Sequence, residues 1–501
     1  MAKPKSIFVC QNCGQDYPRW QGRCDSCGEW NTLVEETKAQ PAGKSNSLGG
    51  HSQAPVAEMI RFSEVDRLSA SKQRFSTGIG EVDRVLGGEE AGKQGIVPGS
   101  VMLLGGEPGI GKSTLLTQVV LQLIHSYAGG ESEVTAPTQS TPKKSQSKLQ
   151  LDPKVGTTLA APILYVAGEE SPHQISMRID RIVKNEHFLL KNKIGKHLGE
   201  AVEKHLVFST STDIDSICSL IRQINPKLVI IDSIQTMTTS DLTGASGSVG
   251  QIREVTERII ETVKPLHVPA FLIGHVTKEG TIAGPKVLEH MVDTVMELSG
   301  ERTGQLRILR TIKNRFGATD EVGVFQVSEW GLEEVTNPSQ LFLEGSTKSV
   351  PGSTTVCVME GTRPLLLEVQ ALVVDSQLAM PRRVGRGIEL SRIQVLAAVL
   401  QKHAHLPLGT TDIFLSVAGG FAVKEPAVDL GLAVAIASSL KNKAVPEKTI
   451  FIGEVGLLGE IRKVQYLERR IKEAKRLGFE HIISRNTHAT VREVVSAYKL
   501  S

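Results

Sequence analysis

The chain has 501 residues, of which 40% are hydrophobic and only 4% aromatic, with 47 Gly and a formal net charge of +3. The nearly balanced charge excludes a general attraction to nucleic acid, so any such contact must come from a local patch. Four of the six Cys lie within the first 27 residues, unlike a secreted disulfide scaffold, and no apolar run is long enough to span a membrane. We therefore expect a cytoplasmic protein of the α/β class.

The composition predicts several segments along the chain. Residues 1–34 form a Cys-rich unit, and residues 35–60, rich in Gly, Pro and Ser, form a flexible linker. From 61 to 345, apolar runs such as "PKLVIIDS" alternate with helical patterns, which is typical of a parallel sheet with crossover helices. Residues 128–160 are poor in apolar residues and predict a disordered insertion. A different pattern over 346–501 predicts a separate α+β domain.

The first unit carries four cysteines with metal-ligand spacing. Cys10 and Cys13 form one C-x2-C pair, and Cys24 and Cys27 form a second pair after ten intervening residues. Two such pairs can reach the corners of a tetrahedral, structural Zn²⁺ site, which a unit this small needs in order to fold. Redox cysteines are the alternative. The nearby Trp20 and Trp30 could contact a partner, although we favour a role in the small core of the unit.

A phosphate-binding motif follows an apolar strand pattern and precedes a helical one. "GGEPGIGKST" fits G-x-x-x-x-G-K-[ST], in which backbone N–H groups surround phosphate oxygens. Lys112 is predicted to bridge the β- and γ-phosphates of ATP, and Ser113 to ligate Mg²⁺. The predicted nucleotide-binding residues in this loop are Gly106, Glu107, Pro108, Gly109, Ile110, Gly111, Lys112, Ser113 and Thr114.

Polar residues end three further apolar strands. Asp232 closes "PKLVIID" and is predicted to hold Mg²⁺, with a helix N-cap as the alternative. Glu169 and Glu170 follow "ILYVAG", a strand expected beside the phosphate-loop strand. Glu169 is the predicted residue that orients the attacking water, Glu170 is the second choice, and an exposed acid opening a helix is the alternative. His275 could sense the γ-phosphate or be an ordinary core or surface histidine.

Together these motifs resemble the RecA-like ATPases, and within them the RadA (Sms) family of bacterial recombination proteins. The resemblance covers nearly the whole chain through the four-Cys unit, "GGEPGIGKST", "LVIIDSIQT", "KNRFG" at 313–317 and a tail similar to the proteolytic domain of Lon. It implies a RecA-like ATPase core with an N-terminal zinc finger and a C-terminal Lon-protease-like domain. It also implies a homo-oligomeric ring, expected to be a hexamer.

The resemblance gives the "KNRFG" segment a role. In RecA-like rings the nucleotide lies between subunits, so Lys313 and Arg315 are expected to reach the γ-phosphate of the neighbouring subunit. Asn314 would orient the two cations, and Gly317 would release the chain from the strand. A solvated strand end, or a role in coupling hydrolysis to DNA contact, remains as an alternative.

The resemblance also places the DNA path in two loops, 236–251 and 278–290. Both are rich in Gly, Ser and Thr, which can follow a phosphate backbone without reading bases. Arg253, Lys278 and Lys286 would add positive charge. Mobile surface loops are the alternative.

The tail lacks the residues of a Lon peptidase. Lon uses a Ser nucleophile and a Lys base, and the corresponding positions hold Asp429 and Glu468, so no peptidase activity is expected. Two basic sets could instead grip duplex DNA, or form solvated faces. They are Arg382, Arg383, Arg386 and Arg392, and then Arg462, Lys463, Arg469, Arg470, Lys472, Lys475 and Arg476.

The resemblance predicts the function. We expect a DNA-dependent ATPase that binds single-stranded and branched DNA and promotes branch migration with RecA during recombination and repair, using ATP, Mg²⁺ and Zn²⁺. A RecA-like regulatory ATPase without DNA translocation and an ATP-dependent Lon-type protease are the alternatives.

Overall fold

The computed structural model describes residues 5–10, 15–38, 74–87, 94–130, 161–191, 197–242, 244–274, 286–300, 306–343, 349–418 and 422–500. The chain divides into two compact units. The first comprises Met1–Gly300, Arg307–Thr319 and Phe325–Glu334, and the second comprises Glu301–Leu306, Asp320–Val324 and Val335–Ser501. Among the described helices, none combines the length and the apolar character needed to cross a bilayer.

The N-terminal residues form a three-stranded antiparallel sheet in the order β2-β1-β3. Its strands are β1 (Lys5–Cys10), β2 (Asp16–Tyr17) and β3 (Leu33–Lys38). The small core consists of Cys10, Cys24 and Leu33, with Phe8 and Tyr17 packed against them. Strand β3 continues four residues beyond the predicted end of the Cys-rich unit, into the segment expected to be a linker.

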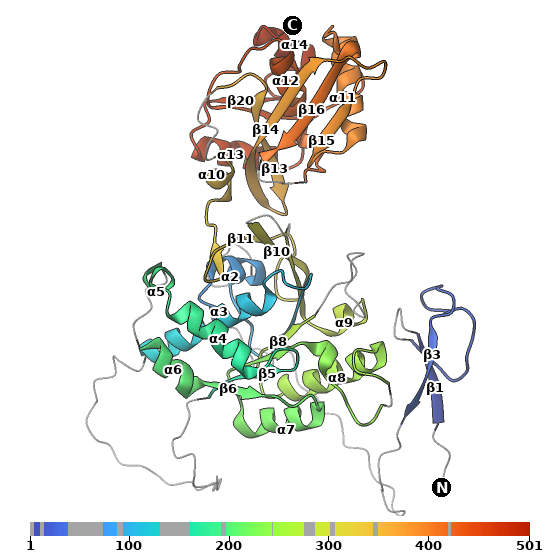
Figure 1. Cartoon of the computed structure of the whole chain (residues 1–501), viewed down its shortest axis with the longest axis vertical. Helices are drawn as coiled ribbons and strands as arrows, with labels where there is room; N and C mark the ends of the chain where they lie inside the picture. Colours follow the sequence, from blue (N-terminus) through green and yellow to red (C-terminus); the bar gives the residue numbers. More distant parts are fainter. Residues whose placement is uncertain are drawn as a thin grey trace, which may run out of the picture. The chain divides into compact units, whose positions relative to one another are not determined.

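A nine-stranded sheet in the order β12-β11-β10-β9-β4-β8-β7-β5-β6 carries most of the first part of the chain (Figure 1). Its strands are β4 (Val101–Gly106), β5 (Ile163–Ala167), β6 (Leu206–Ser209), β7 (Leu228–Asp232), β8 (Ala270–Ile273), β9 (Thr294–Ser299), β10 (Leu306–Asn314), β11 (Val322–Val327) and β12 (Leu332–Glu334). The accompanying helices are α2 (Gly80–Gly87), α3 (Lys112–Gly130), α4 (Pro172–Val183), α5 (Glu186–Lys191), α6 (Leu198–His205), α7 (Ile214–Ile224), α8 (Val249–Val263) and α9 (Lys286–Met291).

The central strands of this sheet are buried on both faces. Figure 1 shows α3, α4 and α6 on one side of the sheet and α7 and α8 on the other. Alternate residues of the strands divide accordingly: Leu104 and Tyr165 belong to the core beneath α3 and α4, whereas Leu103 and Val166 belong to the core beneath α7 and α8. The continuous apolar runs of the sequence therefore correspond to doubly covered parallel strands.

The expected parallel sheet is correct for the centre and wrong at one edge. Strands β4 to β9 pair in parallel, but β10 pairs antiparallel with β9, and β12 antiparallel with β11. Because antiparallel strands need no crossover helix, β10 can follow β9 after a short connection. Helix α3 extends to Gly130, and residues 131–160 of the predicted insertion lie outside the described residues, as do 39–60 of the predicted linker.

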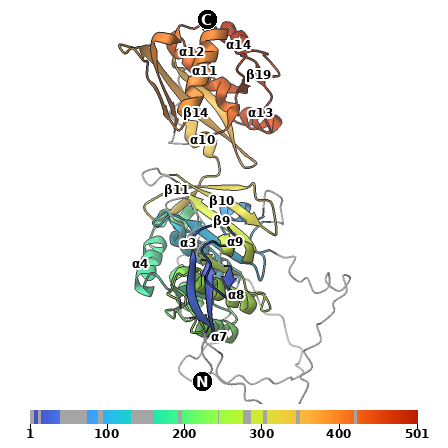
Figure 2. The same cartoon turned by 90° about the vertical axis from the view of Figure 1, so that its right-hand side faces the viewer.

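The second unit is built on a six-stranded mixed sheet in the order β15-β16-β14-β13-β17-β20. Figure 2 shows α11, α12 and α14 gathered together, and their apolar residues share one core with the sheet. The six strands of this sheet are β13 (Ser353–Glu360), β14 (Arg363–Asp375), β15 (Arg383–Arg386), β16 (Thr411–Val417), β17 (Thr449–Ile452) and β20 (His481–Ser484). A separate two-stranded sheet consists of β18 (Glu454–Val455) and β19 (Ile461–Arg462). The helices of this unit are α10 (Pro338–Leu343), α11 (Leu390–His403), α12 (Asp429–Leu440), α13 (Leu467–Arg476) and α14 (Val491–Ala497).

Helix α12 contains the apolar run "GLAVAIA" and is buried along nearly its whole length. A side chain at Gly431 would meet Val356 Cγ1 at 2.1 Å, so the helix can pack this closely on β13 only with Gly there. "GLAVAIA" is thus a central core helix of the second unit.

Candidate nucleotide site and associated motifs

A cavity of about 180 Å³ lies at the carboxyl ends of β4, β5 and β7. It is lined by Pro108, Gly109, Gly111, Lys112, Ser113, Thr114, Glu169, Glu170, Arg178 and Asp232. Ligands of open α/β sheets bind at this edge of the strands. The cavity is smaller than the roughly 300–1,000 Å³ typical of whole-ligand pockets, and its size suits phosphate groups.

Glycines shape the loop that forms one wall of this cavity. Gly106, Gly109 and Gly111 have φ angles of +151°, +78° and +114°, which residues with a Cβ rarely adopt. At Gly106 a Cβ would also meet the carbonyl oxygen of Leu298 at 2.4 Å. Gly106, Glu107 and Ile110 are not among the lining residues, and Ile110 is buried. These three residues of the predicted loop therefore lie outside the cavity lining.

Lys112 is the buried cation of the cavity. Its Nζ donates hydrogen bonds to the carbonyl oxygens of Gly106 at 2.9 Å and Glu107 at 3.0 Å. Burial lowers the pKa of Lys112, while the negative charges of Asp232 and Glu169 raise it. The ammonium group thus lies among acceptors and carboxylates at the place where phosphate oxygens would enter.

Asp232 ends β7 and lies against the start of α3. Its carboxylate accepts hydrogen bonds from the hydroxyl of Ser113 and, at 2.8 Å, from that of Tyr165. Burial raises the pKa of Asp232, and these two hydrogen bonds oppose the rise. A carboxylate and a hydroxyl meeting beside the phosphate loop are the donor set that Mg²⁺ uses in such sites, so these residues fit the ion.

Glu169 and Glu170 follow β5 and reach the same cavity. The expected position of β5 beside the phosphate-loop strand is wrong, because β8 and β7 lie between them. The two acids still reach the cavity because the chain turns immediately after β5. The backbone N–H groups of Gly168 and Glu169 both donate to the carbonyl oxygen of Asp232, at 2.7 and 3.0 Å. Gly168 permits this approach, since a Cβ there would meet Thr236 Oγ1 at 2.3 Å.

Two residues of the cluster are missing from the residues predicted above. Tyr165 lies within a strand whose other residues are aliphatic and small, and a buried Tyr needs a partner for its hydroxyl. That pattern alone could have indicated a polar neighbour. Arg178 lies in α4, with Nη2 2.5 and 2.6 Å from the two carboxylate oxygens of Glu170. Nothing in the spacing of the sequence distinguishes it from other surface arginines.

The "KNRFG" segment lies at the end of β10, and its cations are held away from the phosphate cavity. Lys313 Nζ donates to the carbonyl oxygen of Val292 at 2.9 Å, and Arg315 Nη1 lies 3.2 Å from Asp293 Oδ1. Neither residue lines the cavity of the same chain. Asn314 bridges the segment to its surroundings, because its Nδ2 donates to Leu86 O at 3.0 Å and its Oδ1 accepts from Phe316 N at 3.0 Å.

The predicted DNA loops differ in what the structure describes. Residues 236–251 are tied together by the buried Gln251, whose amide bonds to Thr239, Leu242 and Gly244. Arg258 holds the loop residue Asp241 through an ion pair. Arg253 is exposed on α8. In the second loop, α9 begins at Lys286, while Lys278 and the nearby His275 lie outside the described residues.

Three of the predicted zinc ligands lie together. The Sγ atoms of Cys10, Cys24 and Cys27 lie within 4.8 Å of one another, and those of Cys10 and Cys27 are 3.7 Å apart. Ligands about 2.3 Å from a shared Zn²⁺ lie roughly 3.8 Å apart in a tetrahedron, so this thiol set fits zinc. Cys13 lies outside the described residues. Gly28, after the second pair, has a φ angle of +77°.

The favoured core role of the two tryptophans is wrong. Trp20 is 57% exposed and Trp30 is 67% exposed, and both indoles lie near Gly22. The described core of this small unit consists of Cys10, Cys24 and Leu33, with Phe8, Tyr17 and Cys27 packed against them, and it includes neither indole.

In the second unit the two positions expected for a Lon-type nucleophile and base hold carboxylates in different environments. Asp429 is buried at the start of α12, with Oδ1 3.4 Å from Arg392 Nε, and burial raises its pKa to about 6. Glu468 is exposed in the first turn of α13. These side chains supply neither a hydroxyl nucleophile nor an amine base.

Several cations of the two predicted basic sets are engaged within the unit. Arg470 is fully buried and ion-paired with Glu425, so the proposal that it grips DNA is wrong. Arg392 donates to carbonyl oxygens near Val423 as well as pairing with Asp429. Arg462 and Arg476 pair with neighbouring glutamates.

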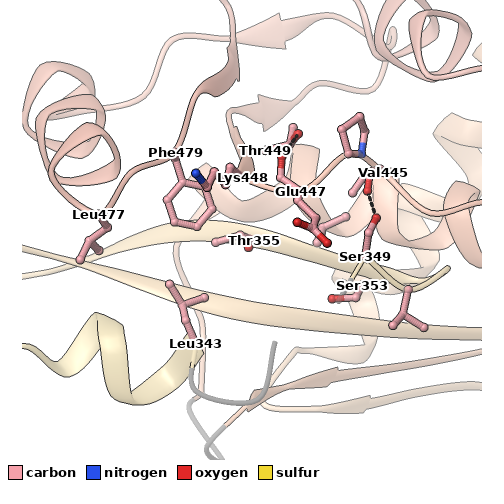
Figure 3. A pocket seen from close by; sticks show the side chains of 13 residues that line it. Leu343, Ser349, Ser353, Thr355, Val445, Glu447, Lys448, Thr449, Leu477 and Phe479 are labelled. Carbon is pink, nitrogen blue, oxygen red and sulfur yellow. Dashed lines mark hydrogen bonds between the residues drawn. The ribbon is translucent and has the colours of Figure 1, made fainter. Parts of the chain in front are cut away.

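A second cavity of about 300 Å³ lies in the second unit (Figure 3). Figure 3 shows Leu343, Leu477 and Phe479 toward one end and Ser349, Ser353 and Glu447 toward the other. Lys448, the one cation among its described lining residues, pairs with Glu480 at 3.2 Å. The cavity combines no set of groups with an evident chemistry.

Three family models match separate parts of the chain. A model described as an AAA domain matches residues 90–281, a rubredoxin metal-binding domain matches residues 8–35, and the ChlI subunit of Mg-chelatase matches residues 382–487. The fold and the cavity thus define a P-loop ATPase of the RecA-like class, with an N-terminal zinc ribbon and a C-terminal Lon-like domain.

Curated relatives then identify the family. The chain is 42% identical over 483 residues to the DNA repair protein RadA of Bacillus subtilis, covering 96% of this chain and 93% of the relative. The proteins of the same name from Pseudomonas aeruginosa and Streptococcus pyogenes serotype M1 are also 42% identical, with the same shares covered. The chain therefore belongs to the RadA family, as its motifs predict.

Proposed function

We propose that the chain is a DNA-repair ATPase that acts as a homo-oligomeric ring, with each nucleotide cleaved between two subunits. The ring would bind single-stranded DNA and migrate branched recombination intermediates together with RecA in the cytoplasm. The family supports the repair role, since its curated members are named DNA repair proteins. The number of subunits, expected to be six, follows from the resemblance to RecA-like rings.

One observation carries the intersubunit site: the cations of the "KNRFG" segment do not line the phosphate cavity of their own chain. Lys313 and Arg315 are bound to carbonyl oxygens at the end of α9 and to Asp293. A rigidly held pair of cations at a strand end can stabilise charge on the phosphates of a neighbouring subunit. The same contacts would hold the pair in position before a neighbour arrives.

The residues of the cavity divide the chemistry of hydrolysis. Lys112 would contact the β- and γ-phosphates, and Ser113 and Asp232 would hold Mg²⁺, which screens the phosphate charge when bound. Glu169 would orient the attacking water from the end of β5. Lys313 and Arg315 of the adjacent subunit would complete the site.

We infer that the Cys-rich unit binds structural Zn²⁺ through Cys10, Cys13, Cys24 and Cys27. The close approach of three thiols supports this assignment. Four thiolate ligands leave no open position for catalysis, so the metal would stabilise the fold of the unit.

The test of the intersubunit site is to mix two inactive variants, Lys112→Ala and Lys313→Ala, and measure ATP hydrolysis with single-stranded DNA. If Lys313 acts on the neighbouring nucleotide, about a quarter of the interfaces in a random equal mixture combine an intact Lys112 with an intact Lys313. Activity should then return in the mixture.

The matched control mixes Lys112→Ala with the double variant K112A/K313A, in which every site lacks Lys112. This mixture should stay inactive. Native mass spectrometry establishes that the variants share rings. Shared rings without recovered activity would show that Lys313 serves its own nucleotide. Hydrolysis by the wild type that ignores single-stranded DNA would instead favour a regulatory ATPase.

A further inference from the structure

Two adjacent carboxylates line the phosphate cavity, and an arginine holds one of them. Arg178 Nη2 lies 2.5 Å from Oε1 and 2.6 Å from Oε2 of Glu170. The side chains of Arg178 and Glu170 are 15% and 31% exposed, so the pair is partly withdrawn from solvent. Charge-assisted contacts of this kind are strong and set the direction of the carboxylate.

A rigid element supplies the guanidinium. Helix α4 begins with a capping box between Ser171 and Gln174, and Pro172 follows the cap. Ile175 and Ile179, which flank Arg178 on the helix, are buried in the core beneath the sheet. Helix α4 begins shortly after Glu170, and Arg178 lies one to two turns into it. The guanidinium of Arg178 therefore lies close enough to contact Glu170.

The pair carries an unusual orphan donor. Within the part of the chain that the structure describes, Nη1 of Arg178 is buried and has no hydrogen-bond partner. A buried unpaired donor lowers stability, and native proteins keep few of them. Arg178 also lines the phosphate cavity. These facts favour a functional reason for the arginine over a stabilising one.

The charges around the cavity give that reason. Glu169, Glu170 and Asp232 place three carboxylates where an anionic triphosphate must bind, against the single ammonium of Lys112. Like charges that line one small, partly desolvated cavity repel one another. The positive charge of Arg178 compensates the negative charge of Glu170, and the contact turns this carboxylate toward α4.

We propose that Arg178 is a positioning residue for ATP hydrolysis: it sequesters Glu170 and thereby leaves Glu169 as the carboxylate that orients the attacking water. This inference deepens the proposed function and rests on it. Arg178 acts through Glu170 and through the local charge, without touching the reacting atoms.

The test is steady-state ATP hydrolysis, with kcat and KM measured for Arg178→Met, Glu170→Gln and the double variant R178M/E170Q. Arg178→Met leaves Glu170 without its partner and should lower kcat about tenfold or more. The reason is that a displaced carboxylate disturbs the catalytic geometry, and small displacements of catalytic groups cost on the order of 10²-fold. Glu169→Gln should lower kcat about 10²-fold or more, and Glu170→Gln should lower it far less than Glu169→Gln does. The double variant should recover to the level of Glu170→Gln, because the unpaired charge is gone.

Arg181→Met, an exposed arginine of the same helix, is the matched control and should hydrolyse ATP like the wild type. A double variant as slow as Arg178→Met would overturn the proposal, since Arg178 would then act on the nucleotide or on the fold. Glu170→Gln as slow as Glu169→Gln would overturn the assignment of the water to Glu169. If the wild type is no faster than Lys112→Ala, the proposed function itself fails, independently of Arg178.

Discussion

Each unit of the chain contains a partly or fully buried Arg–Glu pair, and the two pairs are built differently. In the second unit, Arg470 is 0% exposed and uses all its nitrogens: Nε donates to Gln465 O, Nη1 to Cys357 O, and Nη2 contacts Glu425. In the first unit, Arg178 borders a cavity and leaves Nη1 unpaired among the described residues. Complete pairing indicates a structural role, and an orphan donor beside a cavity indicates a functional one.

One buried aspartate from each unit shows the same contrast. Burial raises the pKa of Asp232 in the first unit and of Asp429 in the second. Asp232 meets a hydroxyl of the phosphate loop at an open cavity, whereas Asp429 pairs with Arg392 at the start of a core helix. A raised pKa alone therefore does not mark a site, and the neighbouring groups decide what the carboxylate does.

The largest expected effect is on the stability of the second unit. Replacing Arg470 by Met removes the ion-pair partner of the partly buried Glu425, which among the described residues keeps only its bond from Met359 N, and the side-chain donor of the Cys357 carbonyl. Breaking a buried pair in this way typically costs about 3–5 kcal/mol. Calorimetry of the full chain should show the transition of this unit at a clearly lower temperature. If Arg178→Met lowers the transition temperature of the first unit by as much, the contrast between the two Arg–Glu pairs is wrong.

The next effect separates activity from stability. Replacing Lys112 by Met should lower ATP hydrolysis about 10²- to 10³-fold, since one preorganised electrostatic group at the phosphates is lost. Thermal unfolding should remain close to that of the wild type, because the hydrogen bonds of the ammonium to Gly106 O and Glu107 O stay within its own loop. A matching loss of stability would mean that Lys112 holds the loop together instead of serving the nucleotide.

A smaller effect depends on pH. The pKa of Asp429 is raised by burial from its ordinary value of 3.8 to about 6. The folded chain therefore binds more protons than the unfolded chain between these values, and the free energy of unfolding falls as pH rises through this window. Asp429→Asn removes the buried charge and should raise the free energy of unfolding of the unit by up to about 3 kcal/mol above pH 6. This gain should vanish toward pH 4.

Unfolding of the wild type and of Asp429→Asn across pH 4 to pH 8 measures this difference. Loss of stability at every pH would show that the ion pair with Arg392 outweighs the cost of burying the charge.

The smallest effect on stability is expected at Glu468, which with Asp429 occupies the positions that correspond to the Lon base and nucleophile. Glu468 is exposed in the first turn of α13, so Glu468→Ala should change stability by no more than about 0.5 kcal/mol. Neither the wild type nor this variant should degrade casein. Casein cleavage by the wild type that Glu468→Ala abolishes would overturn the contrast between an active first unit and a non-catalytic second one.

Much of the fold could be predicted, and the failures have physical causes. The apolar runs of β4, β5 and β7 predict buried parallel strands because both faces must be apolar. The antiparallel edge after β9 and the place of β5 could not be predicted, because strand order depends on which surfaces pack together. The exposure of Trp20 and Trp30 also escaped prediction, since an indole in a small unit can lie inside or outside.

By itself the sequence determined the phosphate loop and the paired cysteines, because each is a short contiguous motif whose chemistry follows from backbone geometry and ligand spacing. Only the tertiary structure decided that Tyr165 meets Asp232, that Arg178 holds Glu170, and that Lys313 and Arg315 lie apart from their own chain's cavity. These contacts depend on sheet order and on the register of helices, which are set by packing across the whole unit and not by any local pattern.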